Sequence, residues 1–225
     1  MKKTKWTLML MLLAVITVLA ACGGEDEAAD DSSSNTGEKT YKVGITQLME
    51  HPSLDAASEG FKAALEEAGL NVEYDAQLAQ GDNSLNTTIA QNLVNSDVDL
   101  IFANSTPSAQ AALAQTTEKP IVFTSVTDAV GAELIASMEA PGGNVTGTVD
   151  LHPDTIANTV KFLKEELGAK NVGTVYNTGE QNSIAQVEQV KAALEADGIA
   201  LHEAAVSTSA EVKQATESLL GKVDS

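Results

Sequence analysis

The side chains best suited to chemistry in this sequence follow predicted strands, at the points where the chain turns into a helix. In open parallel sheets, ligands bind beyond the carboxyl ends of the strands, among connecting loops and helix N-termini. The loops after three predicted strands offer amides, hydroxyls, an imidazole and carboxylates, at Gln47, His51, Asp55, Ser105, Thr106, Thr127 and Asp128. A second unit offers Asn177, Glu180, Asn182 and Ser183 at the same edge. These groups suit the binding of a small polar molecule.

The combination fits a zwitterion. A helix predicted to begin at Pro107, capped by Ser105 or Thr106, directs free N–H groups at the proposed ligand and could hold a carboxylate without Arg. The carboxylates of Asp128, Asp55 or Glu180 could meet an ammonium group. Ser, Thr, Asn and Asp at such junctions are also ordinary helix caps, so each residue has a structural alternative.

The sequence contains no recognisable catalytic motif and no metal-binding motif. There is no G-x-S-x-G, Walker or G-x-G-x-x-G motif, and His51, His152 and His202 are far apart without metal-ligand spacing. An extracellular hydrolase would need a nucleophile, a base and oxyanion donors together, and no such set is evident. We therefore expect no catalytic residues, no metal and no cofactor.

Alternating patterns predict the elements that position these side chains. Short β-rich runs alternate with helical patterns from Tyr41 onward, which favours parallel sheets with crossover helices. We expect strands at 41–46, 70–74, 98–103, 120–124 and 144–149, and, after the pattern restarts, at 171–176 and 199–206. The prediction is an α/β protein with an N-terminal lobe, 41–150, and a second lobe, 151–225. The second lobe has only two or three strands, so we expect it to be incomplete and the chain to be C-terminally truncated.

Charge excludes nucleic acid as a partner. The 225 residues contain 13 Lys, no Arg and 32 Asp or Glu, for a net charge of −19. Such a chain repels phosphate backbones and lacks the guanidinium fork that reads base edges. One Cys excludes an internal disulfide framework.

The first 22 residues resemble a bacterial lipoprotein signal. Three Lys in the first five residues precede an apolar run from Leu8 to Leu19, followed by Leu-Ala-Ala-Cys, which is similar to a lipobox. We predict a signal peptide at 1–21, cleaved before Cys22, and a diacylglyceryl lipid anchor, with acyl chains such as palmitate, on the sulfur of Cys22; the alternative is a buried, unmodified Cys. Residues 22–40 then form an acidic, disordered tether. The folded body is expected to be extracytoplasmic and anchored to the cell membrane.

Four segments of the body resemble a known family. QLMEHPSLDAASEGFKAALEEAG (47–69), ANSTPSAQAA (103–112), KPIVFTSVTDAVGAELIASMEAPGGNVTG (119–147) and YNTGEQNS (176–183) are similar to ABC-transporter substrate-binding lipoproteins of the tryptophan- and aromatic amino acid-binding type. The resemblance runs from about Tyr41 to the end of the chain.

The resemblance implies a type I periplasmic-binding-protein fold, with two Rossmann-like lobes and the ligand in the cleft between them. It implies ligand contacts at Gln47, His51, Asp55, Thr106, Thr127, Asp128, Asn177, Asn182 and Ser183, and ABC permease and ATPase subunits as partners. We expect an aromatic amino acid such as tryptophan as the ligand. A nucleoside or purine, a sugar, or a role as the ligand-sensing subunit of a membrane receptor remain alternatives.

Overall fold

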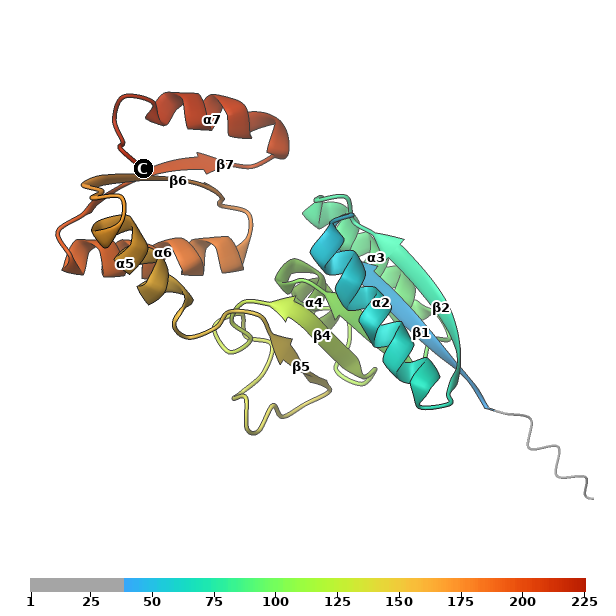
Figure 1. The fold of residues 1–225 in the computed structure, drawn as a ribbon. Helices are drawn as coiled ribbons and strands as arrows, with labels where there is room; N and C mark the ends of the chain where they lie inside the picture. Colours follow the sequence, from blue (N-terminus) through green and yellow to red (C-terminus); the bar gives the residue numbers. More distant parts are fainter. Residues whose placement is uncertain (1–38) are drawn as a thin grey trace, which may run out of the picture. The chain divides into compact units, whose positions relative to one another are not determined.

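The computed structural model describes residues 39–225, and the predicted signal peptide, Cys22 and all but the last two residues of the tether lie outside this range. The N-terminal lobe contains a sheet of five parallel strands in the order β2-β1-β3-β4-β5 (Figure 1). The strands are β1 (Thr40–Gln47), β2 (Asn71–Leu78), β3 (Leu100–Asn104), β4 (Ile121–Val126) and β5 (Val145–Val149). The carboxyl ends of β1, β3 and β4 therefore meet at one edge, as the sequence predicted.

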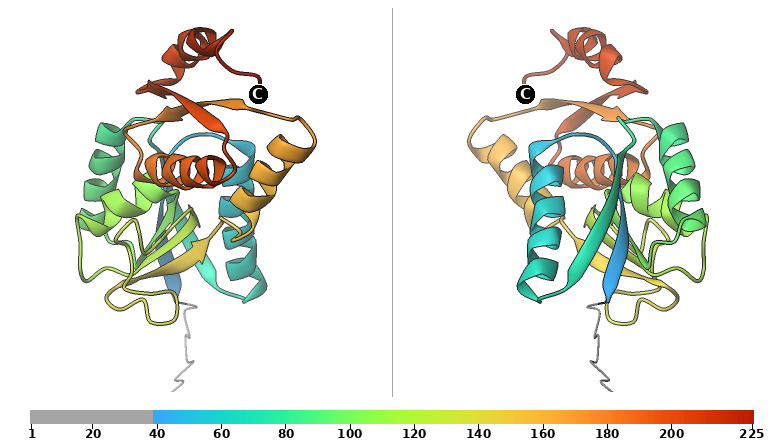
Figure 2. Two further views of the ribbon diagram at one scale, coloured as in Figure 1. Left: turned by 90° about the vertical axis from the view of Figure 1, so that its left-hand side faces the viewer. Right: turned by 90° about the vertical axis from the view of Figure 1, so that its right-hand side faces the viewer.

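Helices cover both faces of this sheet, because successive side chains of each strand point to opposite sides. On one face, Val43, Ile45 and Phe102 pack under α2 (Pro52–Glu67), where Phe61 stacks on Phe102 with ring centroids 4.0 Å apart. On the other face, α3 (Asn83–Asn95) and α4 (Thr106–Leu113) cover a larger core that includes Leu93, Ile101 and Phe123 (Figure 2). Both faces are buried, as in other parallel sheets.

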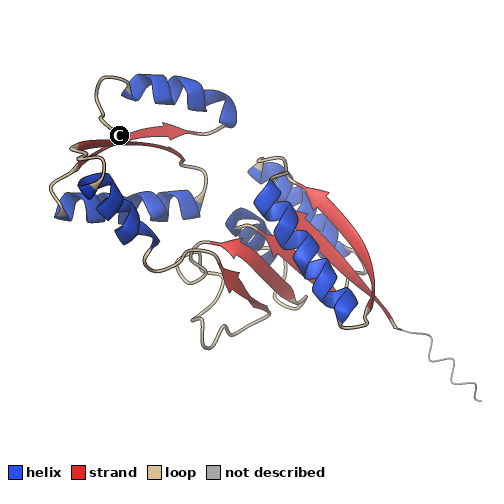
Figure 3. Cartoon of the chain, viewed as in Figure 1, coloured by secondary structure: helices blue, strands red, loops and turns tan. Residues whose placement is uncertain are grey.

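The second lobe has a sheet of two parallel strands, β6 (Asn171–Asn177) and β7 (Ala200–Val206). On one face lie α5 (Thr155–Glu165) and α6 (Gln181–Ala196), and on the other lies α7 (Val212–Leu219), after a short 3₁₀ turn, η1 (Ser209–Glu211) (Figure 3). Val160, Leu194 and Ile199 are buried between the sheet and α5 and α6. Thr40–Ser225 as a whole forms one compact unit.

The last two residues run along the free edge of β6. The N–H of Asp224 donates to the carbonyl of Asn171 at 2.8 Å, and the N–H of Gly173 donates to the carbonyl of Ser225 at 2.8 Å. β6 therefore has β7 on one side and residues 224–225 on the other, just as β1 has β2 and β3 on its two sides in the first sheet. The two lobes thus begin with the same strand arrangement.

The predicted α/β class with parallel sheets is confirmed, and each expected strand is present. The N-terminal strand begins at Thr40, one residue earlier than expected, and β2 continues four residues beyond the predicted end. The division at residue 150 and the incompleteness of the second lobe stay predictions. Within residues 39–225, none of the helices combines the length and the apolar character needed to cross a membrane.

Candidate functional site

A cleft of about 900 Å³ is lined by loops and strand ends of both lobes. The N-terminal lobe contributes the turn after β1 and the loop between β2 and α3, and the second lobe contributes the ends of β6 and β7 and the first turns of α6. The lining residues are Met49, 80–84, 174–177, Gly179, Glu180, Ser183, Gln186, Val187, 206–209 and Val212. Its volume is within the range of about 300–1,000 Å³ that is usual for small-molecule sites.

The ionisable side chains that line this cleft, within the described residues, include two acids and no Lys, Arg or His. Asp82 is the N-cap of α3, and its Oδ1 accepts hydrogen bonds from the N–H groups of Ser84 at 2.7 Å and Leu85 at 3.2 Å. Glu180 precedes α6, and its Oε1 accepts from Asn177 Nδ2 at 2.8 Å. The cleft therefore combines carboxylates with the N-terminal ends of two helices, which carry partial positive charge.

Tyr176 is the aromatic residue of this lining. Its hydroxyl donates to Glu203 Oε2 at 3.0 Å, and this hydrogen bond raises the pKa of the phenol. Glu203 also accepts from Lys191 Nζ at 3.0 Å, and the pKa of its carboxyl is lowered by that bond and by the bond from Tyr176. The hydroxyl of Tyr176 therefore acts as a hydrogen-bond donor to Glu203, a residue of the same lobe.

Three side-chain amides connect the two lobes. Asn83 Nδ2 donates to the carbonyl of Gly179 at 3.1 Å. Gln181 Nε2 donates to the carbonyl of Gly131 at 3.2 Å, and Gln186 Nε2 donates to Thr127 Oγ1 at 3.2 Å. All three donors are neutral, so these contacts carry no ion-pair component.

The predicted residues after β1 form contacts among themselves. Gln47 is buried, and its side chain hydrogen bonds to Asp55 at 2.7 Å. His51 is exposed and caps α2, with Nδ1 accepting from the N–H of Ser53 at 3.2 Å. Of this turn, Met49 reaches the cleft lining. The ligand contacts proposed for Gln47, His51 and Asp55 stay predictions.

The predicted residues after β3 and β4 lie at the start of α4 and in the loop after β4. Ser105 caps α4, with Oγ accepting from the N–H of Ser108 at 3.2 Å, as the sequence indicated. Thr106 is buried beside Thr127, whose N–H lies 3.5 Å from Thr106 Oγ1. Asp128 Oδ1 accepts from the N–H of Gly131 at 2.8 Å and so closes a turn.

Three of the four predicted residues of the second lobe line the cleft, namely Asn177, Glu180 and Ser183. Asn182 lies between Gln181 and Ser183 in the first turn of α6, and its Oδ1 is buried without a hydrogen-bond partner. The structure thus brings part of the predicted set together at this end of α6.

Sequence reasoning missed Met49, Asp82, Asn83 and Gln186. The first three lie in or beside turns at the carboxyl ends of β1 and β2. Ligands of open parallel sheets bind beyond these ends, so the same criterion that selected residues after the other strands could have selected these three. The segment Gly81-Asp82-Asn83-Ser84 was overlooked because the second strand was predicted to end at residue 74. Gln186 lies inside α6 and carries no local signal.

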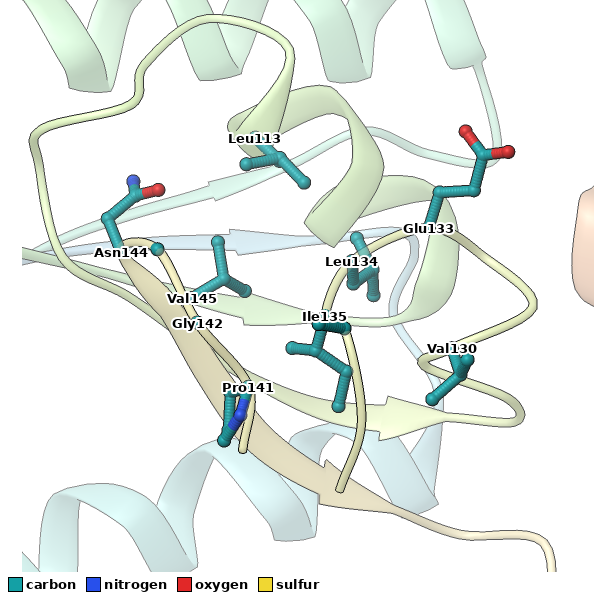
Figure 4. Close-up of a pocket in the computed structure, with 11 residues that line it drawn as sticks. Leu113, Val130, Glu133, Leu134, Ile135, Pro141, Gly142, Asn144 and Val145 are labelled. Atoms are coloured by element: carbon teal, nitrogen blue, oxygen red, sulfur yellow. The ribbon is translucent and has the colours of Figure 1, made fainter. Parts of the chain in front are cut away.

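A second cavity, of about 480 Å³, lies beside the loop that connects β4 and β5 (Figure 4). Leu113, Leu134 and Ile135 give it apolar walls, and the carboxylate of Glu133 points away from them. It offers fewer polar groups than the cleft. Over residues 39–225, no three His, Cys, Asp or Glu side chains are grouped to hold a metal ion.

Comparisons with known proteins agree on one family. A family model described as ABC transporter substrate binding protein matches residues 42–225. A curated relative, the tyrosine-binding protein of Clostridioides difficile strain R20291, is 46% identical over 192 residues, covering 83% of this chain and 55% of its own length. The chain therefore spans about half the length of that relative.

Two solved structures extend the comparison. An ABC domain from Streptococcus pneumoniae in complex with L-Trp is 33% identical, with a TM-score of 0.77, over 82% of this chain and 63% of its own. The ligand-free, open structure of a substrate-binding protein with adhesive properties from Clostridium difficile is 43% identical, with a TM-score of 0.56 and the same coverages. A leucine-binding protein from Thermotoga maritima shares the type I periplasmic-binding-protein fold at 16% identity and a TM-score of 0.59, with 79% of this chain and 53% of its own covered.

Proposed function

The chain belongs to the family of ABC transporter substrate-binding proteins, and we propose that it is the lipid-anchored receptor of an importer for an aromatic amino acid. Proteins of this kind act outside the cytoplasm and bind a substrate rather than convert it. In this proposal the receptor passes its ligand to ABC permease and ATPase subunits.

The observation that carries the proposal is the cleft, with its two acids, its lack of basic side chains in the described residues and its two helix N-termini. A ligand ammonium fits beside Asp82 or Glu180, and a ligand carboxylate fits at the free N–H groups that begin a helix. Met49, Val187 and Val212 supply apolar surface for a side chain. A free amino acid has these three parts.

The relatives support an aromatic side chain. One is named for tyrosine binding and another was solved with L-Trp. This chain is more similar in structure to the L-Trp complex than to the open, ligand-free relative, although its sequence identity with the open relative is higher. In the proposed mechanism, the ligand contacts both lobes and stabilises a closed arrangement.

Thermal unfolding with a panel of amino acids, nucleosides and sugars tests the ligand. A ligand present at 100 times its Kd adds about 2.7 kcal/mol of stability. We expect Trp, Tyr or Phe to raise the melting temperature and the other compounds to leave it unchanged. A cooperative transition that no aromatic amino acid moves would rule out the assignment.

The anchor has its own test. Two acyl chains hold a protein stably on a membrane, so Cys22→Ala should move the protein from the membrane fraction to the soluble fraction. If the variant stays with the membrane, Cys22 is not the point of attachment.

A further inference from the structure

The side-chain amide of Gln47 has no free hydrogen-bonding capacity. Its Nε2 donates to Asp55 Oδ1 at 2.7 Å and to the carbonyl of Met49 at 2.9 Å. Its Oε1 accepts from Ser58 Oγ at 2.8 Å and from Asn104 Nδ2 at 3.1 Å. A glutamine amide has two N–H hydrogens and two acceptor lone pairs. All four are used inside the protein, and the residue is only 3% exposed.

Ser58 and Asn104 determine which way this amide points. Ser58 Oγ and Asn104 Nδ2 both donate to Gln47 Oε1, and the two hydrogens of Asn104 Nδ2 are shared with Ser58 Oγ at 2.9 Å and the carbonyl of Leu54 at 2.7 Å. Because both neighbours act as donors, the oxygen of Gln47 faces them and its NH₂ group faces the acceptors of Asp55 and Met49. Ser58 and Asn104 are themselves buried, so water does not compete for these bonds.

The turn that Gln47 holds is connected to the cleft. The carbonyl of Gln47 accepts from the N–H of Ala79 at 2.9 Å, and the carbonyl of Leu48 accepts from the N–H of Gly81 at 2.8 Å. The methyl group of Met49 lies 3.4 Å from the point where a Cβ on Gly81 would stand. Met49 and the 80–84 loop both line the cleft. The position of this part of the lining therefore depends on the turn after β1.

We infer that Gln47 is a positioning residue and not a ligand contact. Oriented by Ser58 and Asn104, it holds Asp55 and the carbonyl of Met49, and through the turn it fixes the β2–α3 loop on the N-terminal side of the cleft. The inference deepens the proposed function and rests on it where ligand affinity is concerned. The hydrogen-bond network itself is testable without any ligand.

The decisive substitution is Gln47→Glu in the full chain. An ionised Glu at this position keeps the acceptor role toward Ser58 and Asn104 but opposes the carboxylate of Asp55 and the carbonyl of Met49. A protonated Glu restores one donor and can again bond to Asp55. Asp55 is the titratable group that contacts the position, while Glu50 and His51 in the same turn are exposed.

Burial and the neighbouring carboxylate both raise the pKa of a Glu here, so the variant loses stability as the pH rises above the ordinary Glu value of about 4.3. We expect its melting temperature to lie below that of the wild type at pH 7 and the difference to shrink toward pH 5. The matched control is Gln77→Glu in the edge strand β2, since the half-buried Gln77 bonds through Nε2 to the exposed Asp75 at 3.1 Å. The control should show little difference at either pH.

The double variant Gln47→Glu with Asp55→Asn exchanges donor and acceptor across the same contact. The Asn amide now donates to the Glu carboxylate, so part of the lost melting temperature should return and the pH dependence should weaken. A double variant less stable than both single variants, or a Gln47→Glu chain that behaves like the Gln77→Glu control, would overturn the assignment.

Affinity for L-Trp, L-Tyr and L-Phe provides the second readout. Gln47→Glu should weaken binding by about tenfold at pH 7 and recover toward pH 5 in parallel with the melting temperature. Weaker binding with unchanged melting behaviour would make Gln47 a direct ligand contact and overturn the inference. If the wild type binds none of the three, the proposed function fails, and the ligand-free melting curves still decide whether Gln47 orders the turn.

Discussion

Gln186 and Thr127 join the two lobes through a single hydrogen bond, in which Gln186 Nε2 donates to Thr127 Oγ1 at 3.2 Å. Thr127 follows β4 and is 8% exposed, and Gln186 belongs to α6 and lines the cleft. This bond exists only while α6 lies against the loop after β4. It therefore stabilises the contact between the two lobes and involves no ligand.

Gln186→Ala should weaken ligand binding uniformly. A neutral hydrogen bond contributes about 0.5–1.5 kcal/mol, which corresponds to roughly a 2- to 12-fold rise in Kd. Titration with Trp, Tyr and Phe should give the same factor for each, because the bond acts on closure. Gln189→Ala, at an exposed position of the same helix, is the control. A factor that differs strongly among the three ligands would indicate direct contact instead.

Ser105 adopts a backbone conformation that suits glycine, with φ 138° and ψ 162°, while its side chain caps α4. Such strain costs of order 1–3 kcal/mol, and loss of a cap costs about 1 kcal/mol to Ala but only a few tenths to Gly. Urea denaturation should find Ser105→Gly more stable than Ser105→Ala by about 1 kcal/mol or more. Equal stabilities would mean that the conformation of Ser105 carries no strain.

Two glycines should respond to Ala in opposite directions. A Cβ on Gly147 of β5 would lie 2.1 Å from the carbonyl oxygen of Phe123, so Gly147→Ala must displace β5 from β4 and should cost about 1–3 kcal/mol. Gly60 lies in α2 with open space around its Cβ position, and Gly60→Ala should stabilise the chain by about 0.5–1 kcal/mol. Chemical denaturation of both variants measures this contrast. A stable Gly147→Ala variant would contradict the close approach of β4 and β5.

Asp224 should stabilise the second lobe in a pH-dependent way. The N–H groups of Asn171 and, less strongly, Lys170 donate to its carboxylate and lower its pKa in the folded chain. The stabilisation is therefore complete above the ordinary Asp value of about 3.9 and is lost as the pH falls through the lower folded value.

The test is Asp224→Ala, whose melting temperature should lie below that of the wild type at neutral pH and approach it near pH 3. Glu188→Ala, at an exposed position on α6, controls for the loss of one negative charge. A difference that stays constant with pH would exclude the carboxylate as its source.

The strands were predictable because their apolar residues are buried against helices. Ile45, Ile101 and Phe123 mark strands that have neighbours on both sides, and these strands were placed within two residues at either end. β2 was predicted too short because it is an edge strand, paired with β1 alone, and its last residues are largely exposed. Its apolar pattern fades where the pairing with β1 continues.

The site was less predictable because its contacts join distant residues. Strand-to-helix junctions can be read from local sequence, and they led to Asn177, Glu180 and Ser183 in the cleft lining. Whether a junction residue faces a ligand or the protein depends on its partners. Gln47 is saturated by Ser58 and Asn104, and no local pattern reveals that.

Tyr176 lies in the cleft lining, and the single Trp of the sequence, Trp6, belongs to the predicted signal peptide. A protein freed of that peptide contains no indole, so tryptophan bound in the cleft would supply the only indole attached to the protein. Excited Tyr176 would then transfer energy to bound tryptophan over a short distance, and the emission would change from phenol to indole. The cleft thus provides an optical signal for its own occupancy without any attached dye.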